Sequence, residues 1–317
     1  MRNLRTEDEI IANWKGDIDK PVVSICCITY NHEPYIEDAL EGFLIQETDF
    51  PFEILIHDDA STDRTADIIR EYEAKYPRLI KPIYQTENQY SQGKRASVIL
   101  LPNAKGEFIA LCEGDDYWTD AKKLQIQTAY LLQNPEIVIT GHDAFIVDEQ
   151  GNHIKDSKLP NPQKRDFTGE DLILGKAWIL TMSWMFRNVD LGNVPERGMV
   201  KNGDNFFVSF LGRFGGSHYH DDIKPAGYRV HPGGVWSMLS DLDKKDSQLN
   251  TWFWMYRYYQ RIGEKKYARH YWMKYLRTLF FRASLKDLSK EYAIRVLFLR
   301  EQKALLKKAL VKIGVIK

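Results

Sequence analysis

The sequence predicts an α/β protein with a mostly parallel sheet flanked by helices, followed by a helical C-terminal appendage. Three observations indicate this architecture. Apolar runs rich in β-branched residues alternate with segments that carry apolar residues at helical spacing, which is typical of parallel strands joined by crossover helices. Two of the apolar runs end in clustered carboxylates. The last part of the chain loses this alternation and becomes aromatic and basic.

Strands and helices are expected in strict alternation up to about residue 120. The expected strands are residues 21–31, 52–61, 79–85 and 107–112. The expected helical stretches between them are residues 32–46, 62–77 and 93–106. Thr62 is the expected N-cap of the second helix, and Pro77 marks its expected end.

The pattern changes after residue 120. A helix is expected at residues 122–135 and another at 203–215, where Gly215 and Gly216 mark the end. One or two strands are expected within residues 136–152, and further strands at 178–188 and 224–236, the last running into a glycine-rich turn. From about residue 246 the chain is expected to be mostly helical.

Composition narrows the class of protein. The chain has 317 residues, of which 44% are hydrophobic, so a large core is possible. The three cysteines (Cys26, Cys27 and Cys112) show no CxxC spacing, which argues against a disulfide framework or a zinc site and favours a reducing cytosol. No apolar leader and no apolar run of membrane-spanning length occurs. The sequence therefore predicts a cytoplasmic protein.

Charge divides the chain into two parts although the formal net charge is zero. Residues 251–317 contain 17 Lys and Arg against 4 Asp and Glu, whereas the first 250 residues contain 27 basic and 40 acidic residues. The C-terminal part therefore has a different kind of surface.

Both acidic motifs follow expected strands. "HDDAS" contains Asp59, and "EGDD" runs from Glu113 to Asp116. Ligands bind at the carboxyl ends of strands in open α/β sheets, and adjacent carboxylates suit Mg²⁺ or Mn²⁺. A solvated turn is the alternative for "EGDD", and helix capping is the preferred role for Ser61 and Thr62. Tyr30, in the loop after the first strand, could stack on a nucleobase.

Three stretches in order carry a resemblance to a known family. They are VSICCITYNHEPYIEDAL, FEILIHDDASTDRTADII and GEFIALCEGDDYWTDAKKLQIQ. Together they resemble the nucleotide-binding half of the family two glycosyltransferases, enzymes of the GT-A fold, over roughly residues 20–235. The resemblance implies a GT-A-type, Rossmann-like sheet. The implied organisation is an N-terminal extension (1–20), a catalytic domain (21–245, with halves 21–120 and 121–245) and a basic aromatic helical region (246–317).

The resemblance also implies roles for the strand-end residues. Thr29, Tyr30 and Asp59 match positions that hold the nucleoside. Asp115 would face the sugar-nucleotide, and Asp116 would ligate Mg²⁺ or Mn²⁺. Glu113 stands at the first acidic position of the family signature, where many relatives have Asp, so a supporting role is plausible.

The remaining predicted site residues come from later segments or depart from the family pattern. Many relatives carry Ala-Arg-Asn before the signature strand; this chain has Lys94 and Arg95 earlier, and Arg95 is predicted to reach the diphosphate, with a solvated helix face as the alternative. By resemblance Asp204 is the general base, although an N-cap role would explain the residue type and Gly203 replaces an acid of the relatives.

The motif "YRVHPGG" completes the predicted site. His231 is a predicted metal ligand and Arg229 a predicted phosphate partner, while a hydrogen-bonded surface histidine is the equally favoured alternative for His231. Both residues end the strand expected at 224–236.

The resemblance implies transfer of a sugar, with inversion, from a nucleoside diphosphate sugar to a hydroxyl acceptor. A UDP-linked donor, a glycan or lipid-linked glycan acceptor and bacterial-type polysaccharide or glycolipid synthesis are the default expectations. The alternatives are a sugar-phosphate nucleotidyltransferase, from which the loop "TYNHEPY" differs because it lacks a glycine-rich phosphate loop, and a non-catalytic interaction protein with the same fold.

The C-terminal region leaves two interpretations open. Its aromatic residues at helical spacing favour packing on the catalytic domain, while its basic residues are also typical of a helix in peripheral contact with the inner, anionic face of a membrane. Nucleic-acid binding is not expected because no recognition motif accompanies the charge.

Overall fold

The computed structural model describes residues 4–234 and 239–282, and the chain divides into two compact units. Unit 1 comprises residues 1–238 and unit 2 residues 239–317. The predicted helical structure of residues 283–317 lies outside the described part of the chain.

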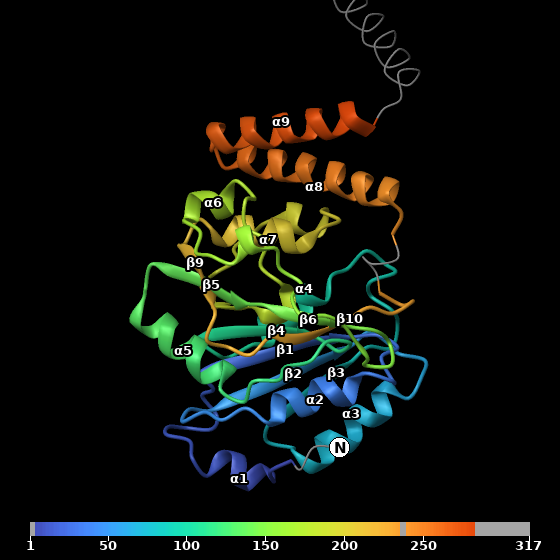
Figure 1. The fold of residues 1–317 in the computed structure, drawn as a ribbon, viewed down its shortest axis with the longest axis vertical. Helices are drawn as coiled ribbons and strands as arrows, with labels where there is room; N and C mark the ends of the chain where they lie inside the picture. Colours follow the sequence, from blue (N-terminus) through green and yellow to red (C-terminus); the bar gives the residue numbers. More distant parts are fainter. Residues whose placement is uncertain (1–3, 235–238, 283–317) are drawn as a thin grey trace, which may run out of the picture. The chain divides into compact units, whose positions relative to one another are not determined.

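Unit 1 is built on a seven-stranded sheet with the order β3-β2-β1-β4-β8-β5-β9 (Figure 1). Only β8 runs antiparallel to its neighbours β4 and β5; the other pairs are parallel. The strands are β1 Val23–Thr29, β2 Phe52–Asp58, β3 Ile80–Tyr84, β4 Phe108–Glu113, β5 Ile137–His142, β8 Met185–Arg187 and β9 Gly216–His220. The predicted mostly parallel α/β sheet is confirmed.

A second sheet has three strands in the order β10-β6-β7. Its strands are β6 Ala144–Val147, β7 His153–Lys155 and β10 Ala226–Arg229. β10 and β6 are parallel, and β6 and β7 are antiparallel. An isolated bridge between Tyr117 and Gly227 joins β10 to the segment after β4. The segment that carries the "EGDD" motif therefore meets the strand that leads to His231.

Helices cover the sheet of unit 1, and α2 and α3 lie next to each other beside β2 and β3 (Figure 1). The α-helices are α1 Glu7–Ile11, α2 Ile36–Leu44, α3 Thr65–Lys75, α4 Ala96–Leu100, α5 Lys123–Gln133, α6 Gly169–Ile173 and α7 Gly203–Leu211. Short 3-10 helices are η1 Leu101–Asn103, η2 Asn161–Gln163, η3 Thr181–Ser183 and η4 Pro195–Gly198.

Three local predictions were wrong. Thr62 is not the N-cap of α3, because that helix begins at Thr65 with Arg64 at its N-cap, and the Thr62 backbone N–H instead donates to Asn31. The strand expected at 178–188 is reduced to β8, because residues 181–183 form η3. Gly216 does not simply end a helix, since β9 begins there.

The core explains why the acidic motif is followed by two large aromatic residues. Trp118 is fully buried, packs edge-on against Phe43 with ring centroids 4.9 Å apart, and donates from its indole to the Met182 carbonyl. A Cβ at Gly42 would lie 2.9 Å from the Trp118 backbone nitrogen, so glycine permits this approach. Burial of such a side chain stabilises the fold by roughly 1.5–3 kcal/mol. Trp118 thus fixes the chain directly after the carboxylates.

The N-terminal segment packs on unit 1. Thr6 and Glu9 form a capping box at the start of α1. Glu7 accepts from the backbone N–H groups of Arg78 and Leu79, and Ile10 is buried in the hydrophobic core. The segment before β1 therefore contributes to the core of the unit.

Unit 2 is a helical hairpin of α8 (Asp241–Arg261) and α9 (Lys265–Arg282), starting five residues before the helical region expected from 246. Gly263, with φ of 83°, occupies the turn. Tyr271 is fully buried and stacks on Tyr259 with ring centroids 5.6 Å apart. No helix within residues 4–234 and 239–282 is long and apolar enough to cross a membrane.

Candidate functional site

The predicted site begins where three neighbouring parallel strands end together. In the strand register Thr29 of β1 lies opposite Asp58 of β2, and Ile28 lies opposite Glu113 of β4. The carboxyl ends therefore meet at one edge of the sheet, where the two acidic motifs were expected to converge. The structure brings the "HDDAS" and "EGDD" segments to adjacent strand ends.

Hydrogen bonds join the loop after β1 to the loop after β2. The backbone N–H of Asn31 donates to Ser61 Oγ (2.9 Å), and that of His32 donates to Thr65 Oγ1 (2.8 Å). Asn31 has a positive φ of 53°, which bends the loop. These bonds fix the position of His32 and leave the Tyr30 side chain 42% exposed, as a stacking role requires.

Asp59 is buried and holds a third loop. Its two carboxylate oxygens accept from the backbone N–H groups of Gln89 (2.7 Å) and Tyr90 (3.0 Å). The neighbouring Thr29 hydroxyl is buried, and it has no hydrogen-bond partner among the described residues. Asp59 therefore positions the loop after β3, and each of its oxygens keeps a lone pair.

A cluster of possible metal ligands forms around Asp115. His231 Nε2 lies 3.0 Å from Asp115 Oδ2, and His32 Nε2 lies 3.9 Å from the same oxygen. One ligand atom from each residue falls within 4.8 Å of the others. The intervening Gly114 permits this approach, because a Cβ there would lie 2.9 Å from Thr29 Oγ1 and 3.0 Å from His32 Nδ1. His32 was not predicted as a site residue.

The electrostatics of this cluster favour a charged carboxylate beside neutral imidazole. Burial alone would raise the pKa of Asp115, but the hydrogen bond with His231 and the nearby His32 outweigh it and lower this pKa. Burial lowers the pKa of His32 in spite of Asp115, so its imidazole is neutral near pH 7. Both are the protonation states that a divalent metal ion requires.

Asp116 has a different environment from Asp115. Its side chain is buried, and Oδ1 accepts from the Arg229 backbone N–H at 2.9 Å. Burial, together with the charges of Asp115 and Glu113, raises the pKa of Asp116. It does not belong to the three-residue cluster, so its predicted role as metal ligand stays a prediction.

Glu113 lies between the strand edge and the start of α7. Burial, followed by the charge of Asp115, raises the pKa of Glu113 to about 8, and Asp204 adds to this shift. Its Oε2 is buried, and it has no hydrogen-bond partner in the part of the chain that the structure describes. The protonation of Glu113 therefore depends on the charges of both Asp115, predicted to face the sugar-nucleotide, and Asp204, predicted to be the general base.

Arg229 is held by several groups at once. Its Nη2 lies 2.6 Å from Asp38 Oδ2, and its Nε donates to the Asp115 carbonyl at 3.2 Å. The guanidinium also lies over the rings of Tyr35 and Tyr117. These contacts place a buried positive charge beside the cluster and support the backbone of Asp115.

Asp204 lies in the first turn of α7, but it is not the N-cap. Asn202 occupies that position and makes no side-chain capping bond, so the structure does not support capping as the role of Asp204. The Asp204 side chain is open to solvent, yet desolvation by surrounding protein raises its pKa while Arg95 opposes the shift. A raised pKa suits a carboxylate that accepts a proton.

Arg95 packs against the start of the same helix. Its Nη2 donates to the Lys201 carbonyl at 3.1 Å, and a Cβ at Gly203 would lie 2.8 Å from its Nη1. Gly203, which replaces an acid of the relatives, therefore makes room for this guanidinium. The contact joins the start of α4 to the segment before α7, so Arg95 lies near enough to Asp204 to act on its pKa.

Lys158 is a second residue that sequence reasoning missed. Its Nζ lies 3.3 Å from the centroid of the Tyr228 ring. Burial lowers the pKa of Lys158 to about 8, and the charge of Asp116 opposes this shift. No motif marks this lysine in the sequence; only the packing of the second sheet brings it near Asp116.

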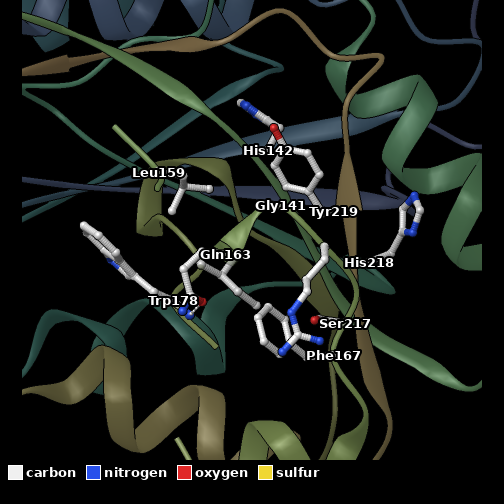
Figure 2. Close-up of a pocket in the computed structure, with 11 residues that line it drawn as sticks. Gly141, His142, Leu159, Gln163, Phe167, Trp178, Ser217, His218 and Tyr219 are labelled. Carbon is white, nitrogen blue, oxygen red and sulfur yellow. Dashed lines mark hydrogen bonds between the residues drawn. The ribbon is translucent and has the colours of Figure 1, made fainter. Parts of the chain in front are cut away.

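A small hollow lies elsewhere on unit 1, between the paired strands β5 and β9 on one side and residues 159–179 on the other. Figure 2 shows His142 of β5 and His218 and Tyr219 of β9 around it, with Trp178 on the opposite wall. It has room for little more than one water molecule. Its lining residues within the described chain include none of those predicted for the nucleotide sugar, and we assign it no function.

Comparison with known families decides the classification. The profile described as "Glycosyl transferase family 2" matches residues 24–190, which is more than half of the chain. The chain belongs to this family. An uncharacterized protein of Mycobacterium tuberculosis is 39% identical to the family 2 chain over 215 residues, 68% of this chain and 60% of the relative. An uncharacterized glycosyltransferase of Methanocaldococcus jannaschii is 33% identical over 155 residues, 48% of this chain and 50% of the relative.

Solved structures confirm the GT-A fold of the family 2 chain. A structure of TarS 1–349 from S. aureus in complex with UDP-GlcNAc has a TM-score of 0.53 and 20% identity, covering 73% of this chain and 66% of that one. The mannosyltransferase PcManGT from Pyrobaculum calidifontis, in complex with GDP-Man and Mn²⁺, has a TM-score of 0.53 and 17% identity, covering 90% and 83%. The identities are low, so these structures inform the fold alone.

Proposed function

We propose that this chain is an inverting glycosyltransferase that moves a sugar from a nucleoside diphosphate donor to a hydroxyl acceptor. The observation that carries the proposal is that the strand ends before Asp59 and Asp115 meet at one sheet edge of a family 2 chain, where His231 contacts Asp115. The TarS and PcManGT structures hold UDP-GlcNAc and GDP-Man, which supports a nucleotide sugar as donor. The family resemblance makes a UDP-linked donor and a role in polysaccharide or glycolipid synthesis the default expectations.

The donor would bind at the edge formed by β1, β2 and β4. Tyr30 would stack on the base, while Thr29 and Asp59 would hold the nucleoside through a hydroxyl and a carboxylate that still have hydrogen-bonding capacity. Arg229 would compensate charge on the diphosphate through the field of its buried guanidinium. Arg95 lies beside Asp204 and would instead bind or orient the acceptor.

The residues around Asp115 fit a divalent metal ion, and the set favours Mn²⁺ over Mg²⁺. Mg²⁺ prefers oxygen ligands, whereas Mn²⁺ also accepts imidazole nitrogen. Asp115, His231 and His32 would hold the ion, which would supply Lewis-acid stabilisation of the departing diphosphate, worth several kcal/mol. Asp116 would support Asp115 by anchoring the Arg229 backbone.

Asp204 would act as the general base. Its exposed carboxylate can reach an acceptor from solvent, and its raised pKa strengthens it as a base. The base would remove the acceptor proton as the acceptor hydroxyl oxygen attacks the anomeric carbon from the face opposite the diphosphate. The bond between that carbon and the diphosphate oxygen would break, the nucleoside diphosphate would leave, and the configuration would invert. Glu113, whose raised pKa of about 8 leaves it mostly protonated near pH 7, would spare Asp115 and Asp204 a third neighbouring negative charge.

A donor screen tests the proposal. The full chain is incubated with Mn²⁺ and a panel of UDP-, GDP- and dTDP-sugars, and free nucleoside diphosphate is measured with and without glycan acceptors. We expect slow diphosphate release from one donor, accelerated by an acceptor, and a product with inverted anomeric configuration by NMR. Release of pyrophosphate would identify a nucleotidyltransferase. Absence of both binding and turnover across the panel would identify a non-catalytic protein.

A further inference from the structure

Aromatic residues of α8 and α9 pack against each other inside the hairpin of unit 2. On α9, Tyr267 and Tyr271 contact Tyr259 of α8, with ring centroids 5.5 and 5.6 Å apart, and Tyr275 contacts Phe253 at 5.9 Å. Positions 267, 271 and 275 follow one another by four residues and so form one face of the helix. This inner face of α9 is therefore already covered by α8.

The opposite side of α9 is basic, with apolar residues between the cations. We define this outer face by residues at spacings of three or four: Lys266, Arg269, His270, Met273, Arg277 and Phe280. Met273 and Phe280 are 43% and 61% exposed, and Lys266, Arg269 and Arg277 are exposed as well. Most of these side chains line a shallow depression on the helix. The outer face thus combines positive charge with accessible apolar surface.

The charge of α9 indicates the kind of partner. The segment Lys265–Arg282 contains no Asp or Glu, so the helix itself is strongly basic. A helix of 18 residues presents a nearly straight face about 27 Å long, which matches a planar anionic surface better than a concave pocket. Exposed Met and Phe side chains between cations suit the boundary between lipid headgroups and acyl chains.

We propose that the outer face of α9 binds an anionic lipid surface. The helix lies in the plane of the surface, with Lys266, Arg269 and Arg277 near the headgroups and with Met273 and Phe280 inserted below them. Attraction to anionic lipid amounts to about fivefold in affinity per cation near the surface. This inference rests on unit 2 alone and does not depend on sugar transfer.

Co-sedimentation with vesicles tests the proposal. The full chain is mixed with vesicles of phosphatidylcholine alone or with 30% phosphatidylglycerol. We expect binding to the anionic vesicles that weakens with added salt. The variant with Lys266→Gln, Arg269→Gln and Arg277→Gln should bind about 100-fold more weakly, because three cations are removed. Gln keeps a similar helix propensity, and circular dichroism verifies the fold.

A matched control removes the same charge elsewhere. Lys81, Lys245 and Arg257 are exposed cations outside the outer face, and their combined change to Gln should alter binding by less than about threefold. A further variant, Met273→Ala with Phe280→Ala, should weaken binding by about tenfold, because both side chains lose inserted apolar area.

Four results would overturn the proposal. These are no binding of the full chain to anionic vesicles, equal losses in the triple variant and its control, unchanged binding by the Met273 and Phe280 variant, and tighter binding to a single-stranded oligonucleotide than to the vesicles. The last result would assign the outer face to nucleic acid. The first would show that the face is not available to lipid in the intact chain.

Discussion

The carboxylates at the carboxyl-terminal edge of the sheet and the carboxylate at the start of α7 lie in different environments. At the edge, Asp59 and Asp116 accept from backbone N–H groups, and Asp115 is hydrogen-bonded to His231. At the start of α7, Asp204 is open to solvent. The difference teaches that residue type alone does not assign a role: buried carboxylates are suited to holding a ligand, whereas a solvent-exposed carboxylate with a raised pKa is suited to accepting a proton.

The largest expected effect is a loss of kcat on changing Asp204, the carboxylate at the start of α7. Asp204→Asn removes the basic oxygen but keeps the shape, so kcat should fall by about 10²- to 10⁴-fold while donor affinity stays unchanged. Rapid-quench assays measure the chemical step, and calorimetry measures donor binding. Asp241→Asn, at a first-turn acid of α8, is the matched control. Equal loss of donor binding would show that Asp204 belongs to the donor site.

The next effect tests two neighbouring carboxylates on the edge. Asp115→Asn removes the charged ligand between two imidazoles, so Mn²⁺ affinity should fall by about 10²-fold or more. Asp116→Asn keeps an oxygen acceptor for the Arg229 N–H, so its loss should stay below about tenfold. Mn²⁺ titration followed by electron paramagnetic resonance measures both. A larger loss in Asp116→Asn would restore the assignment that sequence resemblance favours.

A smaller effect on Mn²⁺ affinity tests whether His32 belongs to the metal-binding cluster with Asp115 and His231. His32→Gln should weaken Mn²⁺ binding by about tenfold to 100-fold, because one of three ligands loses its imidazole. His153→Gln changes an exposed histidine of β7 and serves as control. An unchanged Mn²⁺ affinity in the His32 variant would leave Asp115 and His231 as the metal residues and His32 as a loop residue.

The smallest effect concerns a buried cation beneath the edge. Lys123 donates to Gln127 Oε1 (2.6 Å) and lies over the Trp118 ring, and burial lowers its pKa to about 7. In the unfolded chain its ordinary pKa is 10.5, so between these values the unfolded state binds the extra proton. The contribution of Lys123 to the free energy of unfolding should therefore rise with pH from 7 upward, by about 1 kcal/mol per unit. Glu113, whose pKa is raised to about 8, contributes in the opposite direction below pH 8, so the effect of Lys123 is the difference between two variants.

Urea unfolding between pH 6.5 and 9 measures this dependence. Lys123→Met should lower the slope above pH 7 by about 1 kcal/mol per unit relative to the natural chain, whereas Lys122→Met, which changes the exposed neighbouring lysine, should leave the slope unchanged. Parallel pH profiles for the natural chain and the Lys123 variant would show that Lys123 stays charged when folded. Such a result would show that the core holds a charged lysine. The contrast between an uncharged Lys123 in the core and a charged Asp115 at the sheet edge would then be lost.

The sequence by itself determined the fold class and the place of the site. Apolar runs specify buried strands, and a parallel order of strands puts their carboxyl ends at one edge, so the convergence of "HDDAS" and "EGDD" could be predicted. β7 and β9 could not, because their residues are exposed or mixed in polarity and lack a clear period.

Only the tertiary structure decided which neighbours each side chain meets. Asp115 and Asp116 are adjacent in sequence, but the turn after β4 directs one toward His32 and His231 and the other toward the Arg229 backbone. Tyr271 of α9 stacks on Tyr259 of α8, a pairing within the tail that the sequence pattern did not predict. Local patterns encode strands and helices, whereas contacts between residues more than 100 positions apart depend on how the packed elements fit together.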